Sequence, residues 1–156
     1  NERMDWLVEK AAELGAASLT PLLAERSALK PSGERADKKL AHWRAVASAA
    51  CEQCGRNRVP QIHAVQSLTG WLDREGSQAD PADGIRLLLS LQPDTRGLLG
   101  AAAGTKPVTL LSGPEGGLTP AEEAAARTAG FLPVTLGPRV LRAETAPLAV
   151  LATLTL

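Results

Sequence analysis

Three short apolar segments alternate with helix-like segments in the second half of the chain, and this alternation restricts the folds open to it. The apolar segments are residues 85–91, 108–111 and 134–136, and the helix-like segments are residues 94–103, 120–129 and 146–154. Strands that alternate with helices are typical of a parallel sheet covered by helices on both faces. The sequence therefore predicts an α/β fold.

The first half of the chain predicts two longer helices. One is expected over residues 2–14 and ends at Gly15, and the other is expected over residues 34–54 and ends at Gly55. Glycine just after a helix adopts the left-handed conformation that ends it without steric cost. The shorter expected elements are a strand over residues 18–23, a helix around Trp71 capped by Ser67, and a polar loop over residues 73–84.

The size and composition of the chain are those of one globular domain. Its 156 residues are 44% hydrophobic and 22% charged, which allows a single substantial core. No apolar stretch is long enough to span a bilayer, so we expect a cytoplasmic protein with no membrane partner. Seventeen basic residues balance seventeen acidic ones, and net charge alone therefore gives no argument for nucleic acid.

The two cysteines, Cys51 and Cys54, give no sign of a metal or redox site. A structural zinc site needs about four ligands, and His42 and His63 lie at the wrong spacing to complete one. The pair also falls near the end of a predicted helix, whereas a redox pair is expected at a helix start, where the dipole activates the thiol. We expect ordinary helix residues and no metal cofactor.

A glycine-rich segment, LSGPEGGLTPAEE at residues 111–123, joins the second apolar segment to the helix after it. Gly113, Gly116 and Gly117 permit a positive φ and a close approach of the backbone to a ligand. Residues 119–122 have the capping-box pattern, with proline at the first helical position. Ligands bind beyond the carboxyl ends of parallel strands in α/β sheets. We therefore expect a ligand site at this loop.

Two common phosphate sites do not fit this loop. The lysine of a P-loop and the G-x-G-x-x-G spacing of a dinucleotide fold are both missing from it. In addition, the negative charge of Glu115 would repel a pyrophosphate. The loop suits a ligand that is not a polyanion, such as an adenine ring whose edge is read by backbone groups.

A second loop with a Gly-Pro pair, LGPRVLRAET at residues 136–145, follows the third apolar segment. Its charged residues would meet a cofactor carboxylate or a substrate, and its apolar residues would flank an adenine ring. The interpretation of Arg142 and Glu144 as isolated surface charges stays open. The candidate contacts are the apolar Val140 and Leu141 and the charged Arg139, Arg142 and Glu144.

The chain carries SGPEGGLTPAEE, LGPRVLRAETAPLAV and, near its start, RMDWLVEKAAELGAASLTPLLAERS. Together these segments resemble the ribosomal RNA small subunit methyltransferase E family of the SPOUT superfamily, and EQCGRNRVP at residues 52–60 is similar to a further segment of that family. The resemblance covers nearly the whole chain. It implies S-adenosylmethionine-dependent methylation of N3 of a uridine in 16S rRNA of the small ribosomal subunit.

The resemblance also implies a SPOUT-type, mostly parallel sheet with a C-terminal trefoil knot, in which three strand-end loops hold the cofactor. Family members are homodimers whose sites are completed at the interface, and they carry an N-terminal PUA-like RNA-binding domain that residues 1–156 do not contain. We therefore expect these residues to be the methyltransferase domain. Two alternatives stay open, namely a SPOUT methyltransferase with another RNA target and a non-catalytic RNA-binding or ribosome-assembly module.

Site residues follow from these segments. Arg142 is expected to stabilise charge on the uracil, and Glu144 is the candidate base or substrate contact, with Glu115 as the competing acid. These two, Arg142 and Glu144, are the predicted catalytic residues. The predicted cofactor contacts are Leu91, Gln92, Ser112, Gly113, Pro114, Glu115, Gly116, Gly117, Leu136, Gly137, Arg139, Val140, Leu141, Arg142, Thr145 and Ala146.

The N-terminal third supplies the candidate RNA contacts, because basic residues anchor phosphates and polar groups hold a splayed base. For each residue taken singly, a solvated surface position is the alternative. Trp6, beside Leu7 on the first helix, is expected to take a core or domain-contact role rather than to stack on a base. The predicted RNA contacts are Arg3, Lys10, Arg26, Gln53, Arg56 and Arg58.

Overall fold

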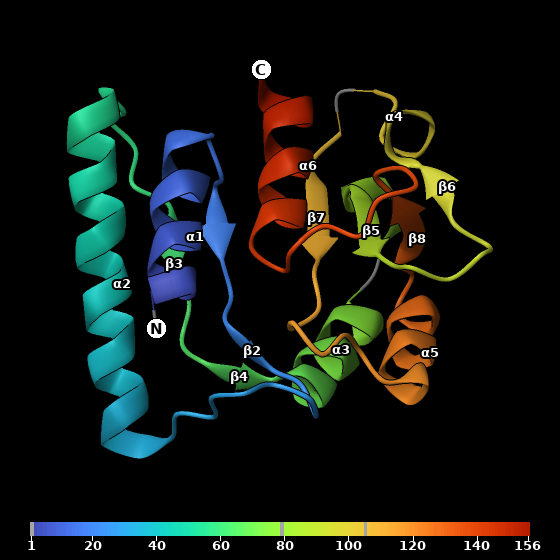
Figure 1. The fold of residues 1–156 in the computed structure, drawn as a ribbon, viewed down its shortest axis with the longest axis horizontal. Helices are drawn as coiled ribbons and strands as arrows, with labels where there is room; N and C mark the ends of the chain where they lie inside the picture. Colours follow the sequence, from blue (N-terminus) through green and yellow to red (C-terminus); the bar gives the residue numbers. More distant parts are fainter. Residues whose placement is uncertain (1, 79, 105) are drawn as a thin grey trace.

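The computed structural model describes residues 2–78, 80–104 and 106–156. An N-terminal part built mostly of two helices lies beside a C-terminal part built on a parallel sheet (Figure 1). The N-terminal part contains α1 (Glu2–Glu13), β1 (Ser18–Leu19), β2 (Leu22–Leu23), α2 (Gly33–Cys54), β3 (Gln61–Ile62) and β4 (Gln66–Ser67). The C-terminal part contains α3 (Leu68–Ser77), the 3-10 helix Pro81–Asp83, β5 (Ile85–Leu89), β6 (Arg96–Gly97), α4 (Leu98–Ala101), β7 (Val108–Leu111), α5 (Pro120–Thr128), β8 (Leu132–Thr135) and α6 (Thr145–Thr155).

The sheet of the C-terminal part is parallel and, within the described residues, has the strand order β6-β8-β5-β7. In β5, Leu88 lies opposite Leu111 of β7 on one side and Pro133 of β8 on the other. Because the strands run the same way, their carboxyl ends meet at one edge. The predicted α/β fold with a parallel sheet is confirmed.

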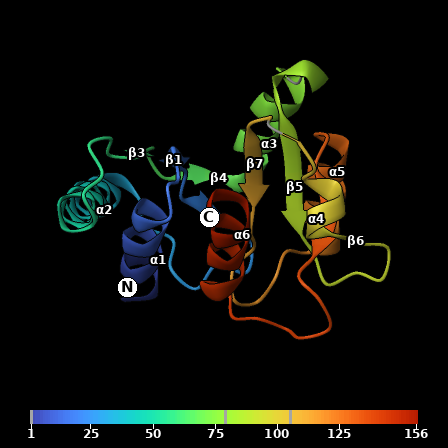
Figure 2. The same ribbon diagram turned by 90° about the horizontal axis from the view of Figure 1, so that it is seen from above.

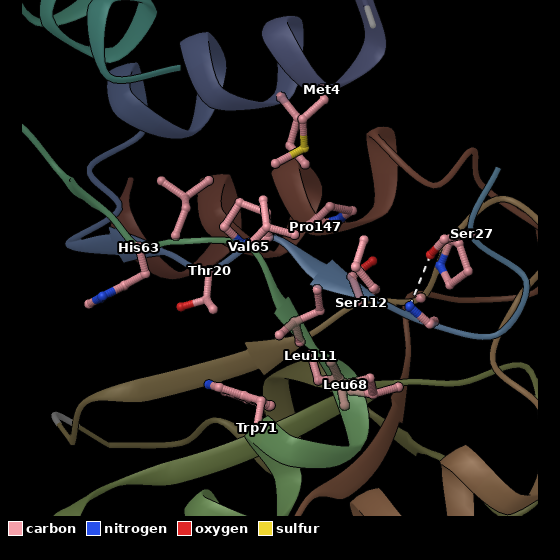
Figure 3. A pocket seen from close by; sticks show the side chains of 18 of the residues that line it. Met4, Thr20, Ser27, His63, Val65, Leu68, Trp71, Leu111, Ser112 and Pro147 are labelled. Carbon is pink, nitrogen blue, oxygen red and sulfur yellow. Dashed lines mark hydrogen bonds between the residues drawn. The ribbon is translucent and has the colours of Figure 1, made fainter. Parts of the chain in front are cut away.

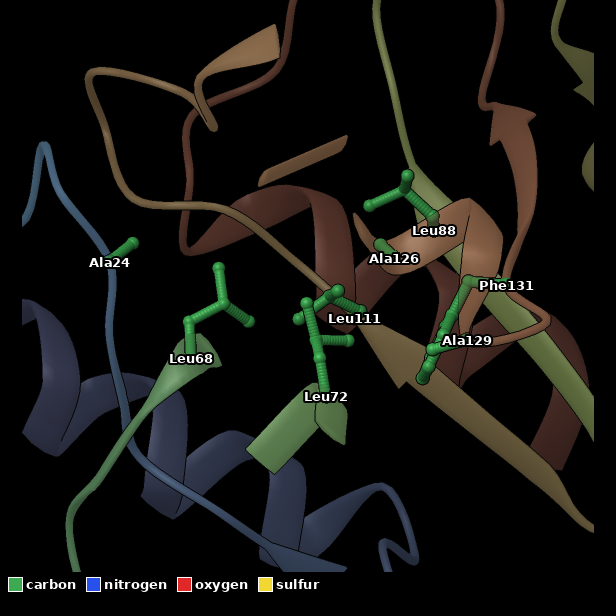
Figure 4. Packing of buried hydrophobic residues seen from close by; sticks show 8 residues of the cluster. All are labelled: Ala24, Leu68, Leu72, Leu88, Leu111, Ala126, Ala129 and Phe131. Atoms are coloured by element: carbon green, nitrogen blue, oxygen red, sulfur yellow. The ribbon is translucent and has the colours of Figure 1, made fainter. Parts of the chain in front are cut away.

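Successive residues of β5 point to opposite faces of the sheet, and helices cover both faces. Leu88 faces α3 and α5, where it is buried with Leu72 and Ala126 (Figure 4). Leu87 faces the other side and packs with Val150 of α6. Figure 2 shows α5 and α6 on opposite sides of β5. Among the described residues, no helix combines the length and the apolar character needed to cross a membrane.

Helices α1 and α2 pack side by side, and a polar contact fixes their pairing. Val8 and Ala12 of α1 are buried in one cluster with Trp43 of α2. The indole Nε1 of Trp43 donates a hydrogen bond to Asp5 Oδ1 at 3.0 Å, and His42 Nε2 lies 3.0 Å from Asp5 Oδ2. Burial raises the pKa of Asp5, but the hydrogen bonds from His42 and Trp43 outweigh it and hold the pKa below its ordinary value.

Three predicted elements differ from the observed ones. The strand expected over residues 18–23 is two separate strands, because β1 pairs with β3 and β2 with β4, and Pro21 between them has no N–H to donate. The helix expected over residues 94–103 is β6 followed by the short α4, since two glycines inside it disfavour a longer helix. The polar loop begins only after α3, which extends through residues 73–77.

The helix ends follow the signals in the sequence. Gly15 and Gly55 have positive φ values of +90° and +77°, as expected for residues that end α1 and α2. The side chain of Ser67 caps α3, and Thr119 and Glu122 form both hydrogen bonds of a capping box at the start of α5. These predicted helix ends are confirmed. Each depends on residues only a few positions apart, so the sequence alone is enough to predict it.

The carboxylate of Glu122 also joins α5 to the N-terminal part. Its Oε2 accepts a hydrogen bond from the Thr119 N–H at 2.8 Å, and its Oε1 accepts one from the Glu25 N–H at 2.8 Å. Burial raises the pKa of Glu122, but these two N–H donors, the Thr119 side chain and the charge of Arg26 outweigh it. Together they hold the pKa below its ordinary value of 4.5.

We expect the hydrogen bonds that Glu122 accepts to stabilise the protein at neutral pH but not in acid. Because the pKa of Glu122 is lower in the folded state than in the unfolded state, the stabilisation is present above pH 4.5 and is lost as pH falls through the folded-state value. Thermal unfolding from neutral pH to about pH 3 measures it. The control is Glu122→Gln, which keeps a capping side chain but does not titrate. The variant should lose stability in acid less steeply, and equal slopes would contradict the prediction.

Candidate functional site

Three loops leave the carboxyl edge of the sheet beside one another. They follow β5, β7 and β8, which are neighbours in the strand order, and they span residues 90–95, 112–119 and 136–144. These loops and the first turn of α6 contain every residue predicted to contact the cofactor, from Leu91 to Ala146. The parallel sheet therefore brings those residues to one edge.

The glycine loop after β7 contains a turn closed by a 2.8 Å backbone hydrogen bond from the Gly117 N–H. Among the three loop glycines, Gly117 is the one with a positive φ, at +73°. A Cβ on Gly113 would lie 3.0 Å from Leu118 Cγ, and one on Gly116 would lie 3.2 Å from Arg26 Cβ. Gly117 therefore uses the positive φ that all three glycines permit, whereas Gly113 and Gly116 make room for the protein's own side chains; a contact of the three with a ligand stays a prediction.

The loop after β8 is held at both ends and exposed in its middle. Thr135 Oγ1 lies 3.3 Å from the backbone N and 3.2 Å from the backbone O of Gly137, whose φ is +119°. At the other end, the Arg142 carbonyl accepts a 3.0 Å hydrogen bond from the Ala146 N–H and so begins α6. Val140, between these ends, is 76% exposed. The loop thus presents apolar surface at a fixed position.

The loop after β5 is anchored by a buried hydroxyl that the sequence analysis missed. Ser90 is 6% exposed, and its Oγ lies 3.1 Å from both carboxylate oxygens of Glu123 on α5 and accepts a 3.2 Å hydrogen bond from the Gln92 N–H. Leu91, between them, is 73% exposed. Ser90 and Glu123 are 33 positions apart, so no local pattern could signal their contact.

Charged side chains from separate segments meet beside these loops. Arg3, in the first turn of α1, forms an ion pair with Glu115 of the glycine loop, and its Nε lies 4.0 Å from Glu144 Oε1. The side chain of Glu144 is 14% exposed, whereas that of Glu115 is 74% exposed. Arg26 Nη1 donates a hydrogen bond to the Gly116 carbonyl at 3.2 Å. The N-terminal part therefore brings two arginines to the predicted cofactor loop.

Only some of the six predicted RNA contacts lie near the glycine loop. Arg3 and Arg26 adjoin the glycine loop. Arg56 instead donates hydrogen bonds to carbonyl groups at the other end of α1, about 14 Å along the helix from Arg3. Lys10 is paired with two glutamates of α1. Two exposed residues lie near the end of α2, Gln53 and Arg58. The RNA-binding role of each of the six stays a prediction.

A cavity of about 1310 Å³ lies between the N-terminal part and the sheet. Helices α1 and α6 border it on one side and α3 and β7 on the other, and Met4, Trp71 and Leu111 line it (Figure 3). Ser112 and Glu144 also line this cavity. The cavity therefore reaches the glycine loop and the start of α6.

A second pocket, of about 350 Å³, is lined by Glu2, Arg3, Trp6, Glu144 and Thr145. Trp6 is 45% exposed, so the core role is wrong for this residue, while the alternative domain-contact role stays a prediction. Its neighbour Leu7 packs instead against buried residues of α1 and α6. Adjacent positions on a helix point in different directions, and α1 buries the leucine while the indole stays outside.

The cysteines lie away from any group of potential metal ligands. Cys51 is buried and Cys54 is exposed, and both are free thiols. In the part of the chain that the structure describes, no three His, Cys, Asp or Glu side chains are grouped to hold a metal ion. That the protein works without a metal stays a prediction.

Comparison with known proteins identifies a matching family and several relatives. The family described as RNA methyltransferase domain matches residues 1–155. The ribosomal RNA small subunit methyltransferase E of Bacillus subtilis is 33% identical and covers 94% of this chain, which in turn covers 58% of that protein. The chain thus spans about three fifths of the length of this relative.

Two solved structures have the same fold. The ribosomal RNA small subunit methyltransferase E of Neisseria gonorrhoeae, bound to S-adenosyl methionine, has a TM-score of 0.88 and 38% identity over 99% of this chain and 61% of its own. A protein of Legionella pneumophila, in complex with the bound cofactor SAM, has a TM-score of 0.89 and 36% identity over the same shares.

Proposed function

We propose, because the chain belongs to the RNA methyltransferase domain family, that residues 1–156 form an S-adenosylmethionine-dependent methyltransferase domain acting on N3 of a uridine in 16S rRNA. The observation that carries the proposal is the meeting of three strand-end loops with Arg142 and Glu144 at one edge of the sheet. The names of the Bacillus and Neisseria relatives support a small-subunit rRNA target. The choice of uridine N3 rests on the family resemblance.

The residues at this edge fit S-adenosylmethionine in their chemistry. Leu91 and Val140 offer exposed apolar surface to an adenine ring, and a Cβ on Gly137 would meet nothing within 4 Å, which leaves open space beside the backbone. The carboxylates of Glu115 and Glu144 suit a ligand that carries positive charge. When bound, S-adenosylmethionine supplies a methyl group on a sulfonium and leaves as S-adenosylhomocysteine.

The side chains of the protein would position the base and accept one proton from it. Uracil N3 loses its proton as it forms the bond to the methyl carbon, and the carboxylate of Glu144 would accept that proton. The guanidinium of Arg142, exposed just before α6, would stabilise the negative charge that spreads to uracil O2 and O4. Arg3, whose Nε is 4.0 Å from Glu144 Oε1, would orient the carboxylate.

The proposal includes finer features that the resemblance implies. The last strand, β8, lies between β6 and β5 in the sheet, which is compatible with the C-terminal trefoil knot that we propose. We also propose a homodimer that acts on the small ribosomal subunit in the cytoplasm. The chain's two arginines at the glycine loop, Arg3 and Arg26, would then lie near the RNA.

The direct test uses the full-length protein, unmodified small-subunit particles and labelled S-adenosylmethionine, followed by mapping of the methylated base. We expect one methyl group at N3 of a single uridine in 16S rRNA. A methyl group on another nucleotide or RNA would leave a SPOUT methyltransferase with a different target. Heat denaturation adds a check, because cofactor at a hundredfold excess over its Kd stabilises the folded state by about 2.7 kcal/mol. No shift and no methylation would leave a non-catalytic RNA-binding module.

Replacing Arg142 by alanine is expected to reduce turnover by about a hundredfold, which is typical of losing one donor to a developing negative charge. Cofactor affinity should fall much less. Methylation kinetics and calorimetry with S-adenosylmethionine measure the two effects separately. Lys38→Ala is the control, since Lys38 pairs with Glu34 on the exposed face of α2. An equal loss of turnover and of cofactor affinity would count against the role of Arg142.

A further inference from the structure

We propose that the pocket beside Arg3 receives the target base, with the ring stacked on Trp6 and its Watson–Crick edge toward Arg3 and Glu144. This inference rests on the proposed methyltransferase function. The pocket lies between the first turns of α1 and α6 and has a volume of about 350 Å³. Small-molecule sites have volumes of about 300 to 1,000 Å³, and this volume lies within that range.

The exposure of Trp6 distinguishes it from the other two tryptophans. Trp43 is buried and donates its indole N–H to Asp5, and the ring of Trp71 packs 5.7 Å from that of Phe131. Trp6 is 45% exposed and lines the pocket. Unstacked RNA bases bind by stacking on aromatic side chains, because every base has a π-face, and an exposed indole offers such a surface.

The polar groups of the pocket match uracil better than cytosine. Uracil presents an N3–H donor between two carbonyl acceptors, whereas cytosine presents an N3 acceptor and an amino donor. A carboxylate such as that of Glu144 accepts only, and a guanidinium such as that of Arg3 donates only. When Glu144 faces N3 and Arg3 faces a carbonyl, the N3–H donor and that carbonyl acceptor of uracil both have hydrogen-bond partners. On cytosine, the same arrangement sets the carboxylate acceptor of Glu144 against the N3 acceptor.

The pocket also adjoins the loops proposed to hold the cofactor. Glu144 ends the loop after β8 and Thr145 begins α6, and the guanidinium of Arg3 contacts both Glu144 and Glu115 of the glycine loop. An enzyme that modifies a ring atom must take the base out of its stack and hold it in a pocket. A base held here would keep N3 beside Glu144, the residue proposed to accept its proton.

Tryptophan fluorescence of the full-length protein, titrated with uridine 5′-monophosphate in the presence of S-adenosylhomocysteine, tests this placement. Stacking on the indole of Trp6 should quench its emission, and Trp6→Phe should abolish the quenching while keeping an aromatic surface. Cytidine 5′-monophosphate should quench less. The inference is overturned if uridine monophosphate causes no quenching, if the quenching persists in Trp6→Phe, or if both nucleotides quench equally.

Methylation kinetics give a second readout. Trp6→Ala should raise the KM for RNA about five- to a hundredfold, with cofactor affinity unchanged by calorimetry, and Trp6→Phe should recover most of the loss. Sedimentation of each variant shows whether Trp6 belongs to an interface between copies; a changed oligomeric state in Trp6→Ala would overturn the inference. Failure of the unaltered protein to bind S-adenosylmethionine would overturn the proposed function itself, so the two failures are distinguishable.

Discussion

Replacement of Glu144 by glutamine is expected to slow methyl transfer by about two to four orders of magnitude, the usual contribution of a positioned acid or base. Glutamine has nearly the same shape and keeps an acceptor toward Arg3, but it cannot take the proton from uracil N3. The start of α6 should survive, because a backbone hydrogen bond from Ala146 to the Arg142 carbonyl forms it. Single-turnover rates at saturating cofactor and RNA measure the loss.

The matched control is Glu115→Gln, because both carboxylates contact Arg3. The side chain of Glu115 is 74% exposed and that of Glu144 is 14% exposed, and an exposed ion pair contributes only about 0 to 1 kcal/mol. We therefore expect Glu115→Gln to lose less than about tenfold in rate. A greater loss in Glu115→Gln than in Glu144→Gln would assign the proton transfer to Glu115.

The parts of the fold that could be predicted from the sequence are those with local signals. Residues 108–111 were predicted as a strand with the bounds that β7 has, because an apolar run there ends at a glycine loop. The capping box of Thr119 and Glu122 needs only residues three positions apart. Since parallel strands end at one edge of a sheet, these local predictions are enough to bring together the three loops proposed to hold the cofactor.

The contacts that complete the site could not be predicted in this way, because they join distant parts of the chain. Arg3 and Glu115 are 112 positions apart, and the sequence indicates that each is charged but not that they meet. Gly116 gives a second example. Its sequence context favours a ligand contact, whereas its missing Cβ leaves room for Arg26, 90 positions away. Tertiary packing and ligand binding leave the same glycine signal in a sequence.

The other large effect is expected when a buried side chain of β5 is truncated. Leu88→Ala should lower the free energy of unfolding by about 2 to 5 kcal/mol, because the removed methyl groups leave a cavity in a close-packed core. Leu88 is 0% exposed and lies with Leu72 and Leu111 on the face covered by α3 and α5 (Figure 4). Single domains are stable by only about 5 to 15 kcal/mol, so much of the total would be lost.

Urea-induced unfolding measures this change, and Leu99→Ala is its control. Leu99 is 73% exposed on α4, so its truncation should change stability by about 0.5 kcal/mol or less. A loss that small in Leu88→Ala would contradict the burial of this face. Because Leu88 lies two residues before the Ser90 anchor, the same variant asks whether the loop after β5 depends on the core beneath it. The direct hydrogen bond of Ser90 to Glu123 should hold that loop, so cofactor affinity per folded molecule should change little even as stability falls.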